Sequence, residues 1–129
     1  MTDFTMKTDA DGVAIITWDV QGKSMNVMTL EAWPVLDGLI DAALADDAVK
    51  GIVITSGKDS FAGGMDLNVI AKMKESAGDN PAKGLFDGLM ESHAILRKIE
   101  RAGMDAKTNK GGKPIAAALP GTALGIGLE

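Results

Sequence analysis

Short apolar runs separated by turn residues open the chain and predict β-strands. Residues 4–7 and 13–20 are rich in β-branched and aromatic side chains, and residues 9–12 between them contain an Asp-Gly pair. An Asp-Gly turn between two such runs is a strong hairpin signal. Residues 51–56 and 114–119 are apolar without polar alternation, which is typical of strands that are covered on both faces.

Apolar residues at helical spacing predict three helices between these strands. The first extends from a Thr29 cap to about residue 45, with Pro34 early in it. A short helix extends from Met65 to about residue 74, and a long one follows Pro81 and ends near Gly103. One face of the long helix carries Leu85, Leu89, His93, Leu96 and Ile99 or Glu100.

Strand and helix units therefore alternate along most of the chain, which predicts an α/β fold with helices packed on a sheet. The sequence has 129 residues, of which 46% are hydrophobic and 24% are charged, a composition typical of one globular domain. Aromatic residues make up only 4%, so the predicted core is mainly aliphatic.

Charge and composition exclude several classes of function. A net charge of -5 disfavours a nucleic-acid partner, because binding phosphates needs a basic surface. The chain has no cysteine, which excludes disulfides and thiolate nucleophiles. No apolar stretch is long enough to span a bilayer, and the acidic, polar N-terminus is unlike a signal or transit peptide, so a cytoplasmic location is expected.

Two glycine-rich loops follow the two apolar strands. Residues 61–67 (FAGGMDL) come after the strand at 51–56, and residues 123–129 (ALGIGLE) come after the strand at 114–119. If those strands are neighbours, the loops meet at one edge of the sheet, where open α/β folds bind ligands. Two converging N–H groups would form an oxyanion hole, in which each donor is worth about 3 to 4 kcal/mol. The alternative is a pair of ordinary strand-to-helix turns.

These segments resemble the enoyl-CoA hydratase (crotonase) superfamily. The similarity lies in residues 56–57, 61–67, 113–117 and 121–129, and residues 22–26 resemble the family's first CoA-contacting loop. The resemblance implies a crotonase-like spiral of repeated ββα units, of which this chain would be the N-terminal part only. The chain looks most like the hydratase domain at the N-terminus of multifunctional fatty-acid β-oxidation proteins, which also contain a 3-hydroxyacyl-CoA dehydrogenase.

The resemblance also implies roles for individual residues. The backbone N–H groups of Met65 and Ile126 would bind the thioester carbonyl of an acyl-CoA while water adds across its 2,3 double bond. Glu129 matches the first of two catalytic glutamates. The second would lie about twenty residues beyond Glu129, so the 129 residues alone are expected to be inactive. The residues expected to contact the CoA thioester are Lys23, Met25, Gly63, Asp66 and Leu67.

Three positions depart from the family pattern. Ile126 stands where glycine is usual, and a β-branched residue there would be costly if the backbone φ is positive. Met65 replaces a commoner alanine beside the expected acyl pocket, and Pro120 replaces a frequent asparagine.

Two alternative functions stay open: an enoyl-CoA isomerase that uses the same oxyanion hole, and a non-catalytic module that binds acyl-CoA or acts as a scaffold.

No cofactor is expected within this segment, since coenzyme A is part of the substrate, and NAD would belong to a dehydrogenase domain outside it. A homo-oligomer or multienzyme complex is expected for the full-length protein.

His93 is the only histidine, so it is expected to be structural. The basic residues near 97–101 and 107–113 fit a solvated helix end and loop better than a CoA-phosphate contact.

Overall fold

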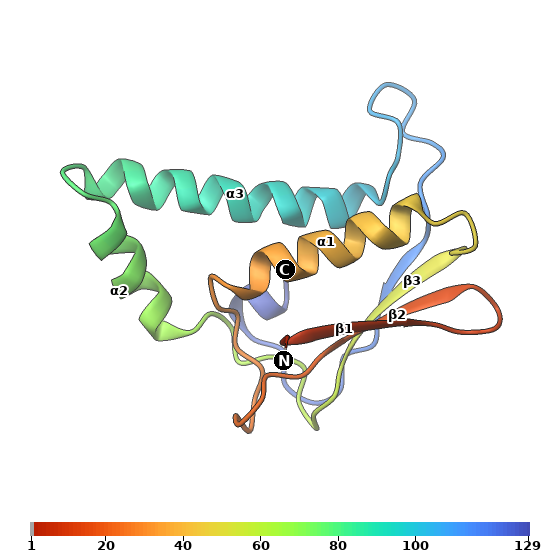
Figure 1. The fold of residues 1–129 in the computed structure, drawn as a ribbon, viewed down its shortest axis with the longest axis horizontal. Coiled ribbons are helices and arrows are strands. Elements are labelled where there is room, and N and C mark those ends of the chain that lie inside the picture. The colour runs from red at the N-terminus through yellow and green to blue at the C-terminus, as the bar shows by residue number, and fades with distance from the viewer. Residues whose placement is uncertain (1) are drawn as a thin grey trace.

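Four strands form one sheet in the computed structural model, which describes residues 2–129. The strands β1 (Phe4–Thr8), β2 (Val13–Trp18), β3 (Gly51–Ser56) and β4 (Ile115–Ala117) lie in that order across the sheet. β1 and β2 form the predicted antiparallel hairpin, whereas β3 and β4 extend the sheet in parallel (Figure 1). Strands β3 and β4 are therefore neighbours, so their carboxyl ends lie at the same edge.

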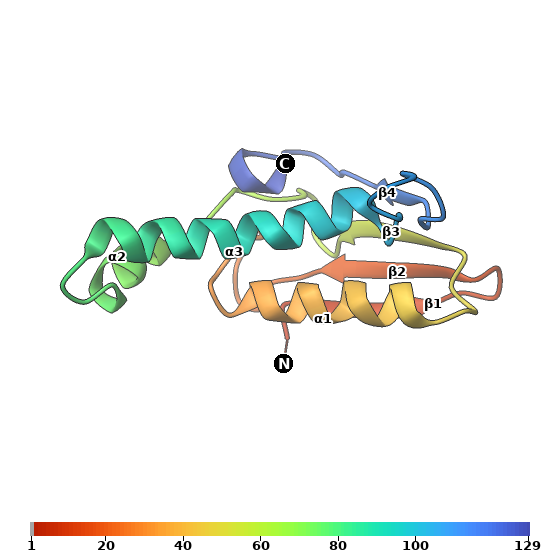
Figure 2. The same ribbon diagram turned by 90° about the horizontal axis from the view of Figure 1, so that it is seen from above.

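The helices are α1 (Ala32–Ala45), α2 (Leu67–Ser76) and α3 (Pro81–Arg101). α1 lies along the sheet and α3 runs beside it, while α2 and the first half of α3 project beyond the strands (Figures 1 and 2). Thr29 caps the start of α1, because its Oγ1 accepts from the Ala32 N–H at 3.2 Å. No helix within residues 2–129 combines the length and apolarity that a bilayer crossing requires.

The core lies between α1 and the sheet. Ile16 of β2, Ile40 of α1 and Ile52 of β3 are at most 2% exposed and fill its centre. The Trp18 ring stacks on Phe4 at a centroid distance of 5.2 Å and meets the edge of Phe61 at 5.8 Å. Phe61 begins the first glycine loop, so this aromatic cluster anchors that loop directly to the core.

The shared face of α3 is buried only in the second half of the helix. Leu96 and Ile99 pack against the core, but Leu85 and Leu89 are each 39% exposed and His93 is exposed. That half of the helix extends past the sheet and packs on α2 alone. Gly84 and Gly88, four residues apart, face the end of α2, where Ala77 and Met73 lie too close for a Cβ at either glycine.

Two predicted element boundaries also differ from the structure. The short helix begins at Leu67 instead of Met65, because Met65 pairs with Met28 and Asp66 caps the helix by accepting from the Asn68 N–H. The last strand covers only Ile115–Ala117. The residues flanking it hydrogen-bond to β3, but they do not form regular ladder pairs.

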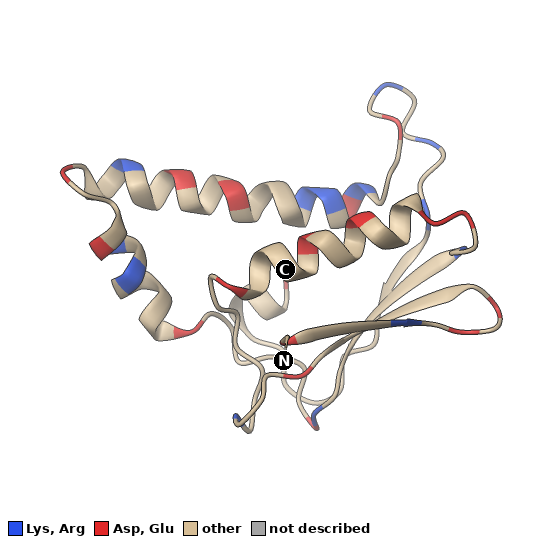
Figure 3. Ribbon diagram, in the orientation of Figure 1, with Lys and Arg blue, Asp and Glu red and all other residues tan. Residues whose placement is uncertain are grey.

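Basic positions near the end of α3 lie beside acidic positions of α1 (Figure 3), and lysines of α3 and of the segment before β4 bind α1. Lys98 lies within 2.8 Å of both Asp37 and Asp41, and its hydrogen bonds to Asp37 and then Asp41 raise the lysine pKa. The Lys113 ammonium donates to the main-chain carbonyls of Ala43 and Asp46, at the C-terminus of α1. These contacts favour the structural interpretation of both basic clusters.

Candidate active site

The first glycine loop pairs on one side with the segment of residues 26–28. The Gly63 N–H donates to the Asn26 carbonyl at 2.7 Å, and the Met28 N–H donates to the Gly64 carbonyl at 2.8 Å. The Asp66 N–H donates in turn to the Met28 carbonyl at 2.9 Å. The expected CoA-contacting loop and the first glycine loop therefore form a short parallel pairing.

On its other side the same loop pairs with the second glycine loop. The N–H groups of Phe61 and Ala62 both donate to the Thr122 carbonyl, at 2.9 and 3.1 Å. The Leu124 N–H donates back to the Ala62 carbonyl at 3.1 Å. The two glycine loops thus lie side by side, as expected from the adjacency of β3 and β4.

This pairing sets the direction of the Met65 N–H. The parallel bridge between Met28 and Met65 is made by the Gly64 carbonyl and the Asp66 N–H, so the Met65 N–H points away from residues 26–28. The turn depends on Gly64, whose φ of +96° is a conformation that other residues rarely adopt. No main-chain carbonyl within residues 2–129 accepts from the Met65 N–H.

The second donor lies in a 3-10 turn, Gly125–Gly127, which follows directly from the second loop. Gly125 carries the positive φ of 55°, whereas Ile126 has a helical backbone without positive φ. The β-branched side chain at position 126 is therefore tolerated without strain. Across the described residues, no main-chain carbonyl accepts from the Ile126 N–H either. A Cβ built on Gly125 would stand 3.5 Å from the Gly64 Cα, so the two turns lie close together.

The residues expected to contact CoA gather around the first loop. The Lys23 ammonium pairs with the Asp66 carboxylate at 2.6 Å, and the sulfur of Met25 lies against the backbone of Gly63. Leu67 is 85% exposed. This arrangement ties the loop of residues 22–26 to the N-terminus of α2.

Acid should weaken this connection between the two elements. The hydrogen bond from Lys23, followed by that from the Asn68 N–H, holds the pKa of the Asp66 carboxyl below its usual value. A lowered pKa stabilises the folded state above the unfolded pKa, and this contribution is lost as the pH falls through the folded pKa. We expect Lys23→Met to raise the Asp66 pKa, measured by a carboxyl NMR titration. Lys72→Met, which removes the partner of Glu31, is the control and should leave the Asp66 pKa unchanged.

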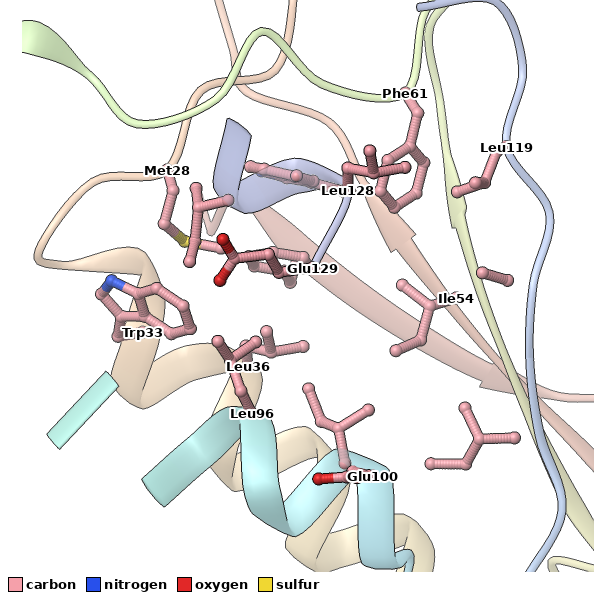
Figure 4. A pocket seen from close by; sticks show the side chains of 17 residues that line it. Met28, Trp33, Leu36, Ile54, Phe61, Leu96, Glu100, Leu119, Leu128 and Glu129 are labelled. Atoms are coloured by element: carbon pink, nitrogen blue, oxygen red, sulfur yellow. The ribbon is translucent and has the colours of Figure 1, made fainter. Parts of the chain in front are cut away.

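An apolar cavity of about 320 Å³ lies between α1, α3, the sheet and the C-terminal segment. Ile126, Leu128 and Glu129 line it together with aromatic and aliphatic side chains of the core. Figure 4 shows the Glu129 carboxylate among Met28, Trp33 and Leu36. A second carboxylate, Glu100 of α3, also reaches this cavity, but it is paired with Arg97 at 2.7 Å.

The predicted site residues thus form two groups. Ile126 and Glu129 line the cavity, whereas the Lys23, Met25, Gly63, Asp66 and Leu67 group surrounds the first loop and does not line it. Met65 and the contact between Gly64 and Gly125 connect the groups. Sequence reasoning missed the pairing of residues 25–28, because Met-Asn-Val-Met does not alternate apolar and polar side chains and its polar residue, Asn26, is one of the two that are buried.

Curated proteins named fatty acid oxidation complex subunit alpha are similar in sequence to this chain. It is 32% identical over 127 residues to the fatty acid oxidation complex subunit alpha of Shewanella frigidimarina and 34% identical over 127 residues to that of Shewanella halifaxensis. In both cases the match covers 98% of this chain and 16% of the relative's length. No model of a known protein family matches the sequence.

Solved structures show which fold this is. An enoyl-CoA hydratase from Shewanella pealeana superposes with a TM-score of 0.79 at 15% identity, covering 98% of this chain and 42% of that structure. An enoyl-CoA hydratase/carnitine racemase from Magnetospirillum magneticum gives a TM-score of 0.79 at 20% identity, covering 99% and 42%. The resemblance found in the motifs is confirmed: nearly the whole chain matches the crotonase fold and accounts for about two fifths of it, and the sequence is similar to fatty acid oxidation complex subunit alpha.

Proposed function

We propose that this chain supplies the oxyanion hole and one catalytic glutamate of an enoyl-CoA hydratase that acts in fatty-acid β-oxidation. The observation that carries the proposal is the pair of adjoining glycine turns, in which the N–H groups of Met65 and Ile126 have no main-chain acceptor within residues 2–129. The similarity to fatty acid oxidation complex subunit alpha supports the pathway.

In the proposed reaction, water adds across the conjugated double bond of a trans-2-enoyl-CoA. The oxygen of water bonds to C3, and the electrons of the double bond move toward the thioester, whose oxygen becomes an enolate. The Met65 and Ile126 N–H groups stabilise that negative charge. Glu129 positions the water and accepts its proton, and the pair of catalytic glutamates delivers a proton to C2 as the thioester carbonyl is restored.

We further propose that residues 1–129 form a partial hydratase domain and that the second catalytic carboxylate lies outside them. The chain covers only 42% of the hydratase structures that it matches. Large apolar side chains are left exposed at the second loop and on the projecting helices, including Leu124, Leu128, Phe86 and Met90. The isolated chain should therefore be inactive. A dehydrogenase domain with NAD, a multienzyme complex and a cytoplasmic location belong to the same proposal for the whole protein.

The test is an assay of the full-length protein that contains this chain. With a trans-2-enoyl-CoA such as crotonyl-CoA we expect hydration. The reaction is measured as the loss of the ultraviolet absorbance of the conjugated thioester. A 3-enoyl-CoA should be converted much more slowly. Rapid conversion of the 3-enoyl substrate without hydration would instead identify an isomerase. Tight binding of acyl-CoA with no turnover of either substrate would identify a non-catalytic module and overturn the proposal.

A further inference from the structure

We propose that Asn26 is a positioning residue that directs the Met65 N–H of the oxyanion hole. The proposal rests on the function proposed above. Asn26 is 0% exposed, which makes it one of the few fully buried polar side chains among the described residues. Burying an amide is costly unless its hydrogen bonds are made, so the contacts of Asn26 indicate what it holds in place.

The Asn26 side chain joins the ends of two strands to the first glycine loop. Its Nδ2 carries two hydrogens and lies within hydrogen-bond distance of three acceptors, the carbonyls of Trp18 and Phe61 at 3.0 and 2.9 Å and the Ser56 hydroxyl at 2.9 Å. Its Oδ1 accepts from the Val20 N–H at 2.9 Å. Trp18 ends β2, Ser56 ends β3, and Phe61 begins the loop, so one amide fixes their relative positions.

The backbone of the same residue holds the next part of the loop. The Asn26 carbonyl accepts from the Gly63 N–H at 2.7 Å, and two residues later Met28 pairs with Gly64 and Asp66. Contacts from the segment of residues 26–28 therefore bracket Met65 on both sides. A shift of Asn26 would be transmitted through Phe61 and Gly63 to the turn that directs the Met65 N–H.

Ser56 extends this network into the turn after β3. Its hydroxyl donates to the Ser60 carbonyl at 2.8 Å and accepts from the Lys58 N–H at 2.9 Å, in addition to the bond from Asn26. Removal of the Ser56 hydroxyl would leave the other contacts of Asn26 in place. Ser56→Ala is therefore a milder perturbation of the same network.

The expected kinetic signature follows from where the network acts. An oxyanion donor stabilises the transition state only if it points at the oxygen that gains charge. A displacement on the order of 1 Å can cost about 10²-fold in rate. The Lys23 ammonium and the Asp66 carboxylate, which are expected to contact CoA, pair with each other and make no hydrogen bond to the Asn26 side chain. The loss should therefore appear in kcat rather than in KM.

The experiment compares full-length protein with the Asn26→Ala and Ser56→Ala variants. For Asn26→Ala we expect kcat for crotonyl-CoA hydration to fall about 10²-fold, with KM changed by less than about threefold. Ser56→Ala should show a smaller fall of about tenfold. Infrared spectra of bound acyl-CoA labelled with ¹³C at the thioester carbonyl should show a lowered stretching frequency in the wild type and a smaller shift in each variant.

Ser92→Ala is the matched control, because it removes a buried hydroxyl of α3 that donates to one main-chain carbonyl, that of Gly88. It should leave kcat and the carbonyl frequency unchanged. If Asn26→Ala does not fold, Ser56→Ala decides the question. Wild-type kcat and frequency in both folded variants, or losses confined to KM, would overturn the positioning role. A wild-type protein that neither hydrates crotonyl-CoA nor shifts its carbonyl frequency would instead refute the oxyanion function.

Discussion

Glu129→Gln should reduce hydration of a trans-2-enoyl-CoA by about 10² to 10⁴-fold in kcat, which is the usual contribution of a positioned acid or base. Glutamine keeps the size and one carbonyl oxygen of the side chain, but it cannot accept a proton from water. The loss should occur in kcat because the thioester would still be held by the loops around Met65 and Ile126. The measurement is steady-state kinetics of the full-length protein with crotonyl-CoA.

The other carboxylate that reaches the cavity provides a comparison. Glu100 comes from α3 and is paired with Arg97, so Glu100→Gln should change kcat by less than about threefold. Equal turnover by the Glu129→Gln variant and the wild type would exclude Glu129 as a catalyst. Equal losses in both variants would indicate that the two carboxylates act together, against the expectation that the second catalytic group lies outside this chain.

The sequence was informative wherever a local signal and a long-range contact agreed. The Asp-Gly hairpin, the strand at residues 51–56 and the two glycine loops have strong local signals, and the parallel order of β3 and β4 brings those loops together. The resemblance to crotonases added the proposed roles of Met65, Ile126 and Glu129, which no spacing rule could supply. The fold and the meeting of the loops could thus be predicted from the sequence.

Features that depend on how elements project in space were not accessible. The periodicity of α3 placed Leu85, Leu89 and His93 on one face, but it could not show that the first half of α3 extends beyond the sheet. The contacts of Asn26 were hidden because its partners include main-chain groups of Trp18 and Phe61, which have no signature in the sequence. Tertiary placement, not local propensity, decided both outcomes.

Gly64→Ala should lower kcat for hydration by about 10² to 10³-fold, the usual loss when one oxyanion donor is misplaced. Gly64 adopts a φ of +96°, and a Cβ there would stand 3.4 Å from the Leu124 carbonyl oxygen of the second loop. An alanine is strained in this conformation, so we expect the backbone to relax and the Met65 N–H to turn away from the thioester oxygen. Steady-state kinetics and the ¹³C carbonyl frequency of bound acyl-CoA both measure this displacement.

Gly78→Ala separates the loss of the donor from backbone strain in general. Gly78 also has a positive φ, of 58°, but it lies in the turn between α2 and α3, and no other atom lies within 4 Å of a Cβ built there. This variant should lose stability through the same conformational penalty while it keeps its kcat and carbonyl frequency. If Gly64→Ala were as active as Gly78→Ala, the first glycine turn would be only a connection between β3 and α2, and the Met65 N–H would have no part in holding the enolate.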